Sequence, residues 1–267
     1  MNSSKDIAEG YKTVAQNKTS TVWYKLLILG ALAGAFIAFG GALSTFAATY
    51  ASSDAATLVK GAVFPVGLIL IVICGAELFT GDCLLIAPLI NKDVKLLPTL
   101  KTLGLAYIGN FIGAVLIAVL VVYSHSMSES VAEACVAVAR NKSAMNFGYA
   151  MLRGILCNML VCLAVWGAMA SKSAGGKILV VYLPVFAFVV CGFEHSVANM
   201  YYQISGLIAS AEYGIAAGGL NFGNSLLYCL LPSTLGNIIG GALIAVAYYA
   251  VYFRRKEPKN PDIAPNT

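Results

Sequence analysis

Two short polar stretches interrupt long apolar runs in this chain, and both carry side chains that can hold a charge or exchange a proton. They span residues 74–82 and 191–199, and both read Cys-Gly-x-Glu-x-x-x-x-Asp/Asn. An ionisable group inside a lipid bilayer is costly, so such a group marks a functional site by default. Two matching interruptions in two halves of one chain predict a substrate path at the junction of the halves.

His195 is the side chain in these stretches best suited to exchanging a proton near neutral pH. Its neighbours Phe188, Phe193 and Val197 are apolar. Burial among them favours the neutral imidazole, which can donate a hydrogen bond to a passing anion or pass it a proton. A histidine that only packs is the alternative interpretation. The position of His195 in one of two matched interruptions favours the functional one.

The other polar residues of the two stretches are predicted to be structural. Glu77 and Glu194 would each accept backbone N–H bonds where a helix is broken. Asp82 and Asn199 are predicted to be the N-caps of the half-helices that restart after each break. The free N–H groups and the dipole of such a helix start favour negative charge.

The elements that position these stretches must be membrane helices. Of 267 residues, 59% are hydrophobic and 11% are charged, and the mean hydropathy is +0.81. Soluble domains carry about 25% charged residues, so the composition predicts an integral membrane protein that forms one compact bundle. The basic residues lie mostly in short loops and at both ends, so the net charge of +5 does not indicate nucleic-acid binding.

The seven cysteines form no Cys-x-x-Cys pair, and their number is odd. They are predicted to be small buried packing residues rather than zinc ligands or disulfides. The two histidines, His125 and His195, are too few and too far apart in sequence for a metal cluster. No cofactor and no enzymatic activity are therefore predicted.

Six apolar runs are long enough to cross a bilayer. They cover residues 26–49, 59–90, 103–123, 149–170, 178–209 and 226–253. The second and fifth are too long for one straight helix, and they contain the two interruptions. Ahead of them, Ile7, Tyr11 and Val14 form a stripe that predicts a short amphipathic helix over residues 5–20. This helix would lie on the membrane surface or over a pore mouth, and a solvated leader is the alternative.

Six spans place both termini on one side of the membrane. Thirteen Lys and Arg residues fall on that side, and four fall on the other, namely Lys60, Arg140, Lys142 and Arg153. Positive charge is retained in the cytoplasm, so both termini are predicted to be cytoplasmic. The membrane is predicted to be the plasma (inner) membrane. The predicted divisions are a cytoplasmic N-terminal segment (1–25, without a signal-peptide core), a six-span membrane domain (26–253) and a cytoplasmic tail (254–267) that starts with Arg254-Arg255-Lys256.

A second internal match supports the likeness of the two halves. Residues 109–119 match residues 236–246, and both segments begin with Gly-Asn. Because each copy has an odd number of spans, the second copy must enter the membrane from the opposite face. The predicted fold class is an all-α membrane protein with six transmembrane helices in an inverted 3+3 repeat, with spans 2 and 5 broken. Pairs of glycines four residues apart predict close helix packing, within a subunit or between subunits. These pairs are Gly30/Gly34, Gly109/Gly113 and Gly236/Gly240.

Four motifs make the chain resemble the formate/nitrite transporter family. They are residues 75–81, 153–158, 192–200 and 236–237, and the resemblance covers about residues 5–253. It implies a homopentamer of aquaporin-like six-span protomers that conduct small monovalent anions across the bilayer. Within the family, the chain looks most like the hydrosulfide channel branch.

The resemblance implies roles for individual residues. His195 is the central pore histidine, and Thr80, on the loop between the halves of span 2, is its hydrogen-bonding partner across the pore. Asn158 and Lys142 match polar residues near that site, with Lys142 attracting anions from the outer loop. The resemblance leaves the role of Asp82 open. Six apolar residues of this chain match residues that narrow the pore in the family, although each would by default be part of the bundle core. They are Phe64, Leu68, Leu78, Phe79, Val161 and Phe188.

Together these features predict passive, pH-dependent passage of a small weak-acid anion such as hydrosulfide, formate or nitrite. An apolar constriction excludes a bare charge, and neutralising the anion near His195 and Thr80 avoids that cost. Proton-coupled symport of formate or nitrite is the alternative. An aquaporin-like facilitator of neutral solutes would carry paired Asn-Pro-Ala motifs, which the sequence lacks.

Overall fold

The computed structural model describes residues 1–253, and all regular secondary structure in them is helical. The all-α fold class predicted from composition is therefore confirmed for this part of the chain. The predicted cytoplasmic tail, with Arg254-Arg255-Lys256, lies outside the described residues.

Five helical segments are long and apolar enough to cross a bilayer. They are α2 (Trp23–Thr49), α3 (Ser53–Val63) with α4 (Val66–Cys74), α7 (Leu96–Tyr123), α9 (Phe147–Ala168), and the run of α12 (Phe222–Asn224), η2 (Ser225–Leu230), α13 (Leu231–Tyr248) and η3 (Tyr249–Phe253). The side chains of these segments are mostly apolar, which is typical of helices that contact both a bundle interior and lipid. Helix α7 starts before the predicted residue 103, because Lys101 interrupts the apolar run but not the helix.

Shorter helices complete the bundle. They are α1 (Ser4–Ser20), α5 (Phe79–Asp82), η1 (Cys83–Leu85), α6 (Ile86–Ile90), α8 (Glu129–Ser143), α10 (Ala174–Val190) and α11 (Ser196–Glu212). The helices α10 and α11 cover the residues predicted for the fifth span, and α4 to α6 cover most of those predicted for the second.

Both interruptions of the apolar runs are breaks in the helices, and a glycine opens each one. Gly75 has a φ of 80° and Gly192 a φ of 67°, the left-handed region that residues with a Cβ rarely adopt. Helix α4 ends just before Gly75, and residues 76–78 are non-helical before α5 begins. Helix α10 ends just before residues 191–195, after which α11 begins. The two breaks leave backbone N–H and C=O groups without intrahelical partners.

Glycines allow the long helices to pack at backbone contact. A Cβ on Gly34 of α2 would collide with the backbone of Asn110 on α7, and one on Gly113 would collide with Ala31. The same holds between α9 and α13, where a Cβ on Gly240 would meet the backbone of Ile155. The small-residue pairs found in the sequence therefore serve packing within the chain, between α2 and α7 and between α9 and α13.

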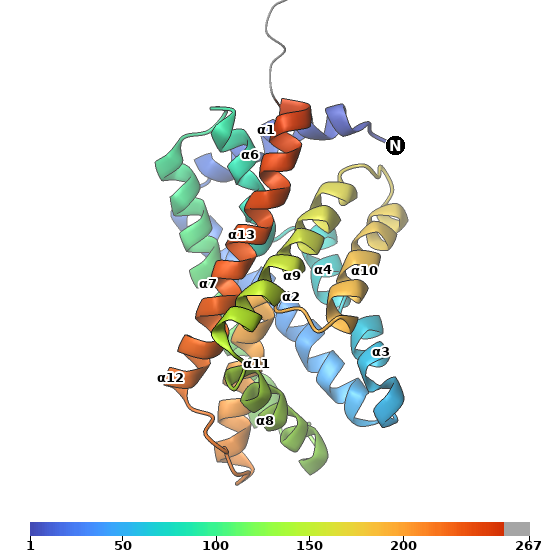
Figure 1. Cartoon of the computed structure of the whole chain (residues 1–267), viewed down its shortest axis with the longest axis vertical. Coiled ribbons are helices and arrows are strands. Elements are labelled where there is room, and N and C mark those ends of the chain that lie inside the picture. Colours follow the sequence, from blue (N-terminus) through green and yellow to red (C-terminus); the bar gives the residue numbers. More distant parts are fainter. Residues whose placement is uncertain (254–267) are drawn as a thin grey trace, which may run out of the picture.

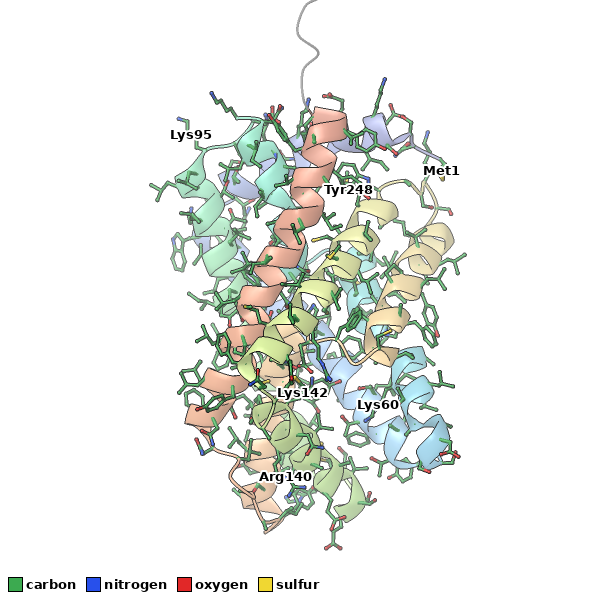
Figure 2. All side chains as sticks on the ribbon, in the orientation of Figure 1. Met1, Lys60, Lys95, Arg140, Lys142 and Tyr248 are labelled. Carbon is green, nitrogen blue, oxygen red and sulfur yellow. The ribbon has the colours of Figure 1, made fainter. Side chains whose placement is uncertain are left out.

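The two ends of the bundle carry different helices (Figure 1). Helix α1 lies across one end, next to α6 and the C-terminal end of α13, and this end is called the α1 end. Helices α8 and α12 lie at the other, the α8 end. Figure 2 shows Met1, Lys95 and Tyr248 towards the α1 end and Arg140 towards the α8 end, with Lys60 and Lys142 further inside the molecule.

Helix α1 is amphipathic and packs on the bundle, as its stripe predicts. Ile7 and Tyr11 are buried and Val14 is half-buried. They belong to a core cluster at the α1 end that includes Leu84 and Trp166. A capping box closes the N-terminus of the helix, with Ser3 as the N-cap residue. The solvated-leader alternative is therefore excluded by the packing of α1.

The prediction that the cysteines are buried is wrong for two of them. Cys74 and Cys191 are exposed, whereas the other five are buried. Both exposed cysteines directly precede the glycine of a break, and Cys191 is exposed because it lines a cavity.

Candidate functional site

The two helix breaks meet in the centre of the bundle. Thr80 Oγ1, in the first turn of α5, lies 3.1 Å from His195 Nε2, at the start of α11. Thr80 is fully buried, and only 3% of the His195 surface is exposed. The structure thus brings together the two residues that the family resemblance pairs across the pore.

His195 is also the N-cap of α11, which sequence reasoning did not predict. Its Nδ1 accepts a hydrogen bond from the backbone N–H of Ala198 at 3.1 Å. An accepting Nδ1 carries no proton, so the proton of the neutral ring is on Nε2. The Nε2–H group is therefore the donor, directed at the hydroxyl oxygen of Thr80 or at a ligand that takes its place.

The predicted capping roles of Asp82 and Asn199 are wrong. Asp82 is the last residue of α5, whose N-cap is Leu78 and has no side-chain capping bond. Asn199 lies one turn inside α11. The sequence pattern located the two breaks correctly. However, α5 begins three residues before Asp82, and α11 begins three residues before Asn199.

Two asparagines from the long helices satisfy the backbone of the breaks. Asn110 of α7 donates to the carbonyls of Gly30 and Glu77 at 2.8 and 2.9 Å and accepts from the N–H of Phe79 at 3.0 Å. This single side chain therefore bridges α2, α7 and the first break, which would otherwise expose unpaired polar groups.

Asn237 of α13 makes the corresponding contacts at the second break. It donates to the carbonyls of Gly154 and Glu194 at 2.8 and 2.9 Å and accepts from the N–H of Ser196 at 2.8 Å. The sequence identified the Gly-Asn pairs as a repeat, and residues 236–237 also as a family motif, but it assigned neither asparagine a role. Their recurrence beside two breaks was the signal that could have identified Asn110 and Asn237 as the side chains that hold the breaks open.

Glu194 binds side chains rather than the backbone N–H groups predicted for it. Lys142 Nζ lies 2.7 and 2.9 Å from its two carboxylate oxygens, and Asn199 Nδ2 donates to it at 2.8 Å. Lys142 was predicted on an outer loop, away from the break. It instead lies in the last turn of α8 and reaches the break. Burial alone would lower the pKa of Lys142, but the Glu194 carboxylate outweighs that effect and raises it.

Glu77 and Asp82 share a lysine that the sequence analysis missed. Lys18 Nζ of α1 lies 2.7 Å from Asp82 Oδ1 and also binds Glu77 Oε2. Burial opposes the charge of Lys18, but the Asp82 and Glu77 carboxylates raise its pKa overall. Lys18 continues the helical stripe, because it lies seven residues after Tyr11 and four after Val14. This spacing was the signal that could have assigned it to the buried face.

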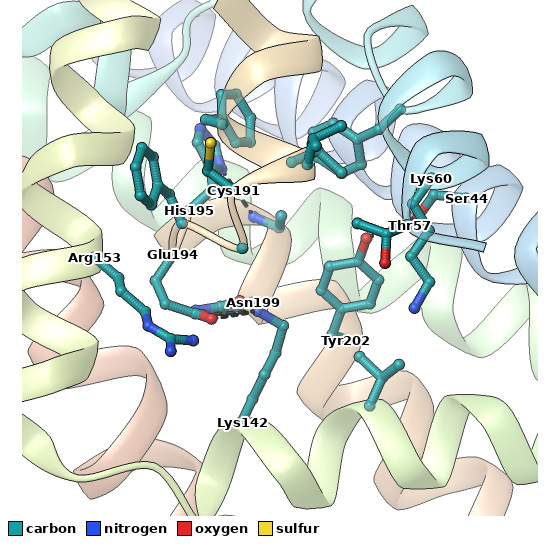
Figure 3. A pocket seen from close by; sticks show the side chains of 18 of the residues that line it. Ser44, Thr57, Lys60, Lys142, Arg153, Cys191, Glu194, His195, Asn199 and Tyr202 are labelled. Atoms are coloured by element: carbon teal, nitrogen blue, oxygen red, sulfur yellow. Dashed lines mark hydrogen bonds and ion pairs between the residues drawn. The ribbon is translucent and has the colours of Figure 1, made fainter. Parts of the chain in front are cut away.

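A cavity opens on each side of the Thr80–His195 pair. The α8-side cavity has a volume of about 440 Å³, and its walls include His195, Phe64 and Phe188 (Figure 3). The α1-side cavity has a volume of about 240 Å³, and its walls include Leu68 and Leu78. His195 lines the α8-side cavity, and Leu78 and Gly81, on either side of Thr80 in the chain, line the α1-side cavity, so the pair lies between the two cavities.

Four of the six predicted constriction residues lie beside this pair. The rings of Phe64 and Phe188 meet edge-to-face with centroids 5.8 Å apart, and Phe188 stacks on the His195 ring at 5.8 Å. Leu68 and Leu78 lie on the α1 side. The apolar side chains thus line the cavity on each side of the Thr80–His195 pair.

The remaining two predicted constriction residues line neither cavity. Val161 is buried in the central core cluster. Phe79 packs edge-to-face on Tyr107 of α7, with centroids 4.8 Å apart. Their placement is the default one for apolar residues in a bundle, which is packing against neighbouring helices.

Asn158 of α9 positions the Thr80 segment. Its Nδ2 donates to the carbonyl of Thr80 at 3.0 Å and to that of Asn237 at 2.6 Å. Its Oδ1 is buried and has no hydrogen-bond partner within residues 1–253. In that part of the chain there is also no group of three His, Cys, Asp or Glu side chains arranged to hold a metal ion.

The sequence is similar to known transporters over nearly its whole length. The profile of the formate/nitrite transporter family matches residues 5–251. The probable formate transporter of Methanothermobacter thermautotrophicus is 34% identical over 93% of this chain and 96% of its own length. The formate channel FocA of Escherichia coli is 34% identical over 87% of this chain and 88% of its own length.

The fold is similar to solved structures of the same kind. A pentameric formate channel with formate bound has a TM-score of 0.78 and 30% identity, over 87% of this chain and 98% of that one. An FNT family ion channel has a TM-score of 0.81 and 26% identity, over 92% of this chain and 98% of that one.

Proposed function

Because the chain belongs to the formate/nitrite transporter family, which comprises transporters and channels rather than enzymes, we propose that it conducts a small monovalent weak-acid anion past His195. The proposed path joins the α8-side cavity to the α1-side cavity. Phe64 and Phe188 narrow it before His195, and Leu68 and Leu78 narrow it beyond.

The observation that carries this proposal is the hydrogen bond between Thr80 and His195 at the meeting point of two helix breaks. Regions of non-helical backbone occur at membrane depth only where they are buried in protein or line a water-filled path. Here two such regions face each other between two cavities. A buried donor, Nε2–H, lies where an anion would have to lose its water.

The chemistry of the pair suits an anion that can be neutralised. Bringing a bare charge into an apolar constriction is costly. The Nε2–H of neutral His195 offsets part of that cost by donating a hydrogen bond to the anion. Full transfer of this proton requires a second proton to reach the ring from the cavity. The acid then crosses as a neutral molecule, and the neutral imidazole is restored.

Hydrosulfide is the substrate that we propose, with formate and nitrite next. The motif resemblance supports hydrosulfide. The relatives support formate, since they include a probable formate transporter and a formate channel. All three are small monovalent anions of weak acids.

The test is flux of each anion into proteoliposomes under an imposed pH gradient. Channel activity predicts uptake of at least one of the three anions down its own concentration gradient without a pH difference. Uptake that requires an inward proton gradient would instead identify the alternative, a proton-coupled formate or nitrite transporter. Passage of glycerol or water without any anion would identify a neutral-solute facilitator, and the proposal would be wrong.

We also propose the assembly and the orientation. The pentameric formate channel to which the fold is similar supports a homopentamer with one path per protomer. The excess of Lys and Arg predicted for one side supports a plasma-membrane protein whose α1 end, with the segment 1–25, faces the cytoplasm. The α8-side cavity would then face outwards.

A further inference from the structure

The charges on the wall of the α8-side cavity do not balance. Three cations line it, namely Lys60, Lys142 and Arg153, together with one carboxylate, Glu194. Lys142 binds both oxygens of Glu194, and the two side chains are 18% and 5% exposed. This pair contributes almost no net charge to the cavity. The positive field of the cavity must therefore come from Lys60 and Arg153.

Lys60 has no acidic partner in the described part of the chain, and neither does Arg153. Lys60 lies on α3, one helical turn before the constriction residue Phe64, whose backbone N–H donates to its carbonyl at 3.0 Å. Residues four apart on a helix share a face. Lys60 thus lines the α8-side cavity on the same face of the helix as Phe64, near the entrance of the proposed constriction.

Hydroxyl groups accompany Lys60 on the same wall. Figure 3 shows Lys60, Thr57, Ser44 and Tyr202 together, on the side of the cavity opposite Arg153. Ser44 Oγ and the Tyr202 hydroxyl are 2.9 Å apart. A lysine beside hydroxyl donors, in a cavity with a positive charge excess, suits a small anion that still keeps part of its water.

We propose that Lys60, with Arg153 opposite, collects anions in the α8-side cavity, and that Lys142 does not, because Glu194 neutralises it. Lys60 and the hydroxyl of Thr57 form the subsite where an anion waits before the constriction, next to Ser44, whose own hydroxyl donates to the carbonyl of Gly41. This inference rests on the proposed anion path. It also transfers to Lys60 the attracting role that the family resemblance implied for Lys142.

Cys191 provides a probe of the field that does not depend on transport. It is exposed and lines the same cavity, whereas the other exposed cysteine, Cys74, lines neither cavity. An anionic and a cationic methanethiosulfonate reagent would be applied to the full-length protein in liposomes. Mass spectrometry of the peptide that contains Cys191 and of the peptide that contains Cys74 gives the ratio of anionic to cationic labelling rates at each cysteine.

Lys60→Gln should lower this ratio at Cys191 by about fourfold at low salt, because removing one charge slows the anionic reagent and speeds the cationic one. The ratio at Cys74 should stay the same. Lys60→Arg should keep the wild-type ratio at Cys191. Arg140→Gln, which removes a cation from the same end but outside the cavity, should also leave it unchanged. The wild-type ratio should fall towards the Lys60→Gln value as salt is added.

The double variant Lys142→Gln/Glu194→Gln separates the two lysines, because it removes both charges of the pair together. Its ratio at Cys191 should stay near the wild-type value. An unchanged ratio in Lys60→Gln, or a loss as large in the double variant, would overturn the proposal. A wild-type ratio that does not respond to salt would overturn it without any variant.

Anion flux then links the field to transport. In Lys60→Gln, the anion concentration that gives half-maximal flux should rise about two- to fourfold at low ionic strength and approach the wild-type value at high salt. If the labelling ratio falls but no anion is transported by the wild type, the anion path is wrong and the charge assignment stands. If flux is normal and the ratio does not change, Lys60 only extends its ammonium group towards water and collects nothing.

Discussion

At the scale of single residues, His195 combines two functions that a sequence motif cannot separate. Nδ1 caps α11, and Nε2 faces Thr80. The cap determines which nitrogen carries the proton, because only an unprotonated Nδ1 can accept the hydrogen bond that the N–H of Ala198 donates. The structural role of the imidazole therefore sets the direction of the donor that an anion would meet.

Substitution of His195 by Asn and by Phe should separate these functions. Asn caps helices well, so His195→Asn should keep the folding stability, whereas His195→Phe should lose about 1 kcal/mol of it. Because Asn cannot exchange a proton near neutral pH, anion flux in His195→Asn should survive but lose most of its pH dependence. Thr80→Ala should weaken the pH dependence less. The measurements are thermal unfolding in detergent and flux against pH in liposomes. Superimposable pH profiles for the wild type and His195→Asn would reduce His195 to a packing and capping residue.

The pair Lys142 and Glu194 should behave as a structural unit. Lys142→Met leaves a buried carboxylate without its cation and should destabilise the protein by about 3 kcal/mol. Replacing Glu194 by Gln as well should recover most of this loss, because the remaining amide can still accept from Asn199. A double-mutant cycle of unfolding in detergent measures the coupling. Additive losses would show that the two side chains are energetically independent.

At the scale of elements, α1 is attached to the bundle by an ion-pair network as well as by apolar contacts. Lys18 reaches Glu77 at the first break and Asp82 at the end of α5. It also lines the α1-side cavity. Its raised pKa keeps the ammonium charged throughout the neutral range. The contact therefore holds α1 over the proposed path, and titration of Lys18 does not release it near pH 7.

Lys18→Met should loosen α1 from the bundle. The substitution leaves two carboxylates at the break without their cation, and α1 then keeps only its apolar contacts through residues such as Tyr11. Amide hydrogen exchange across residues 4–20 should become about tenfold faster or more, because the free energy of local opening of α1 should fall by at least about 1.4 kcal/mol. Lys5→Met, which changes an exposed lysine on the same helix, is the control and should leave the exchange unchanged. Equal exchange in both variants would remove Lys18 from the attachment of α1.

The two apolar layers of the path should set the size of the anion that passes. Leu78→Ala and Phe188→Ala each remove a side chain beside the Thr80–His195 pair and should admit larger monocarboxylates such as acetate and lactate. Ile108→Ala, on an exposed face of α7, should not. Flux of carboxylates of increasing size tests this. If assembled protein keeps its size limit after both substitutions, these side chains do not line the path.

At the scale of the whole molecule, the outside of the bundle remains strongly apolar. Many large side chains on α2, α7 and α13 are exposed, among them Ile28, Ile112 and Leu243. Lipid can cover such a surface, and so can neighbouring copies of the chain. Together with the pentameric structure to which the fold is similar, this surface supports a ring of protomers.

Native mass spectrometry from detergent should give a fivefold multiple of the 28.0 kDa chain. Because each protomer would hold its own path, anion flux should scale with the number of intact protomers when wild type is mixed with an inactive variant. A particle that stays monomeric in several mild detergents would contradict the assembly. A steep loss of flux on mixing would indicate one shared path instead.

Several features of this protein could be predicted from the sequence because they depend on local pattern. Composition identifies a membrane protein, since lipid-facing helices need apolar residues on all sides. The repeated Cys-Gly-x-Glu stretches locate the two helix breaks, because glycine permits the left-handed turn at Gly75 and Gly192. The match to the family motifs selects His195 and Thr80, which the structure places 3.1 Å apart.

Only the tertiary structure decided how the charged and polar groups are paired. Lys18 and Asp82 are 64 residues apart and Lys142 and Glu194 are 52 apart, and no helical or strand period relates such positions. Nor does local pattern distinguish a capping Asn199 from a capping His195, since both are polar side chains near the same helix start. A buried charge or amide binds whichever partner the packed helices bring within about 3 Å, and that choice depends on the positions of all the helices together.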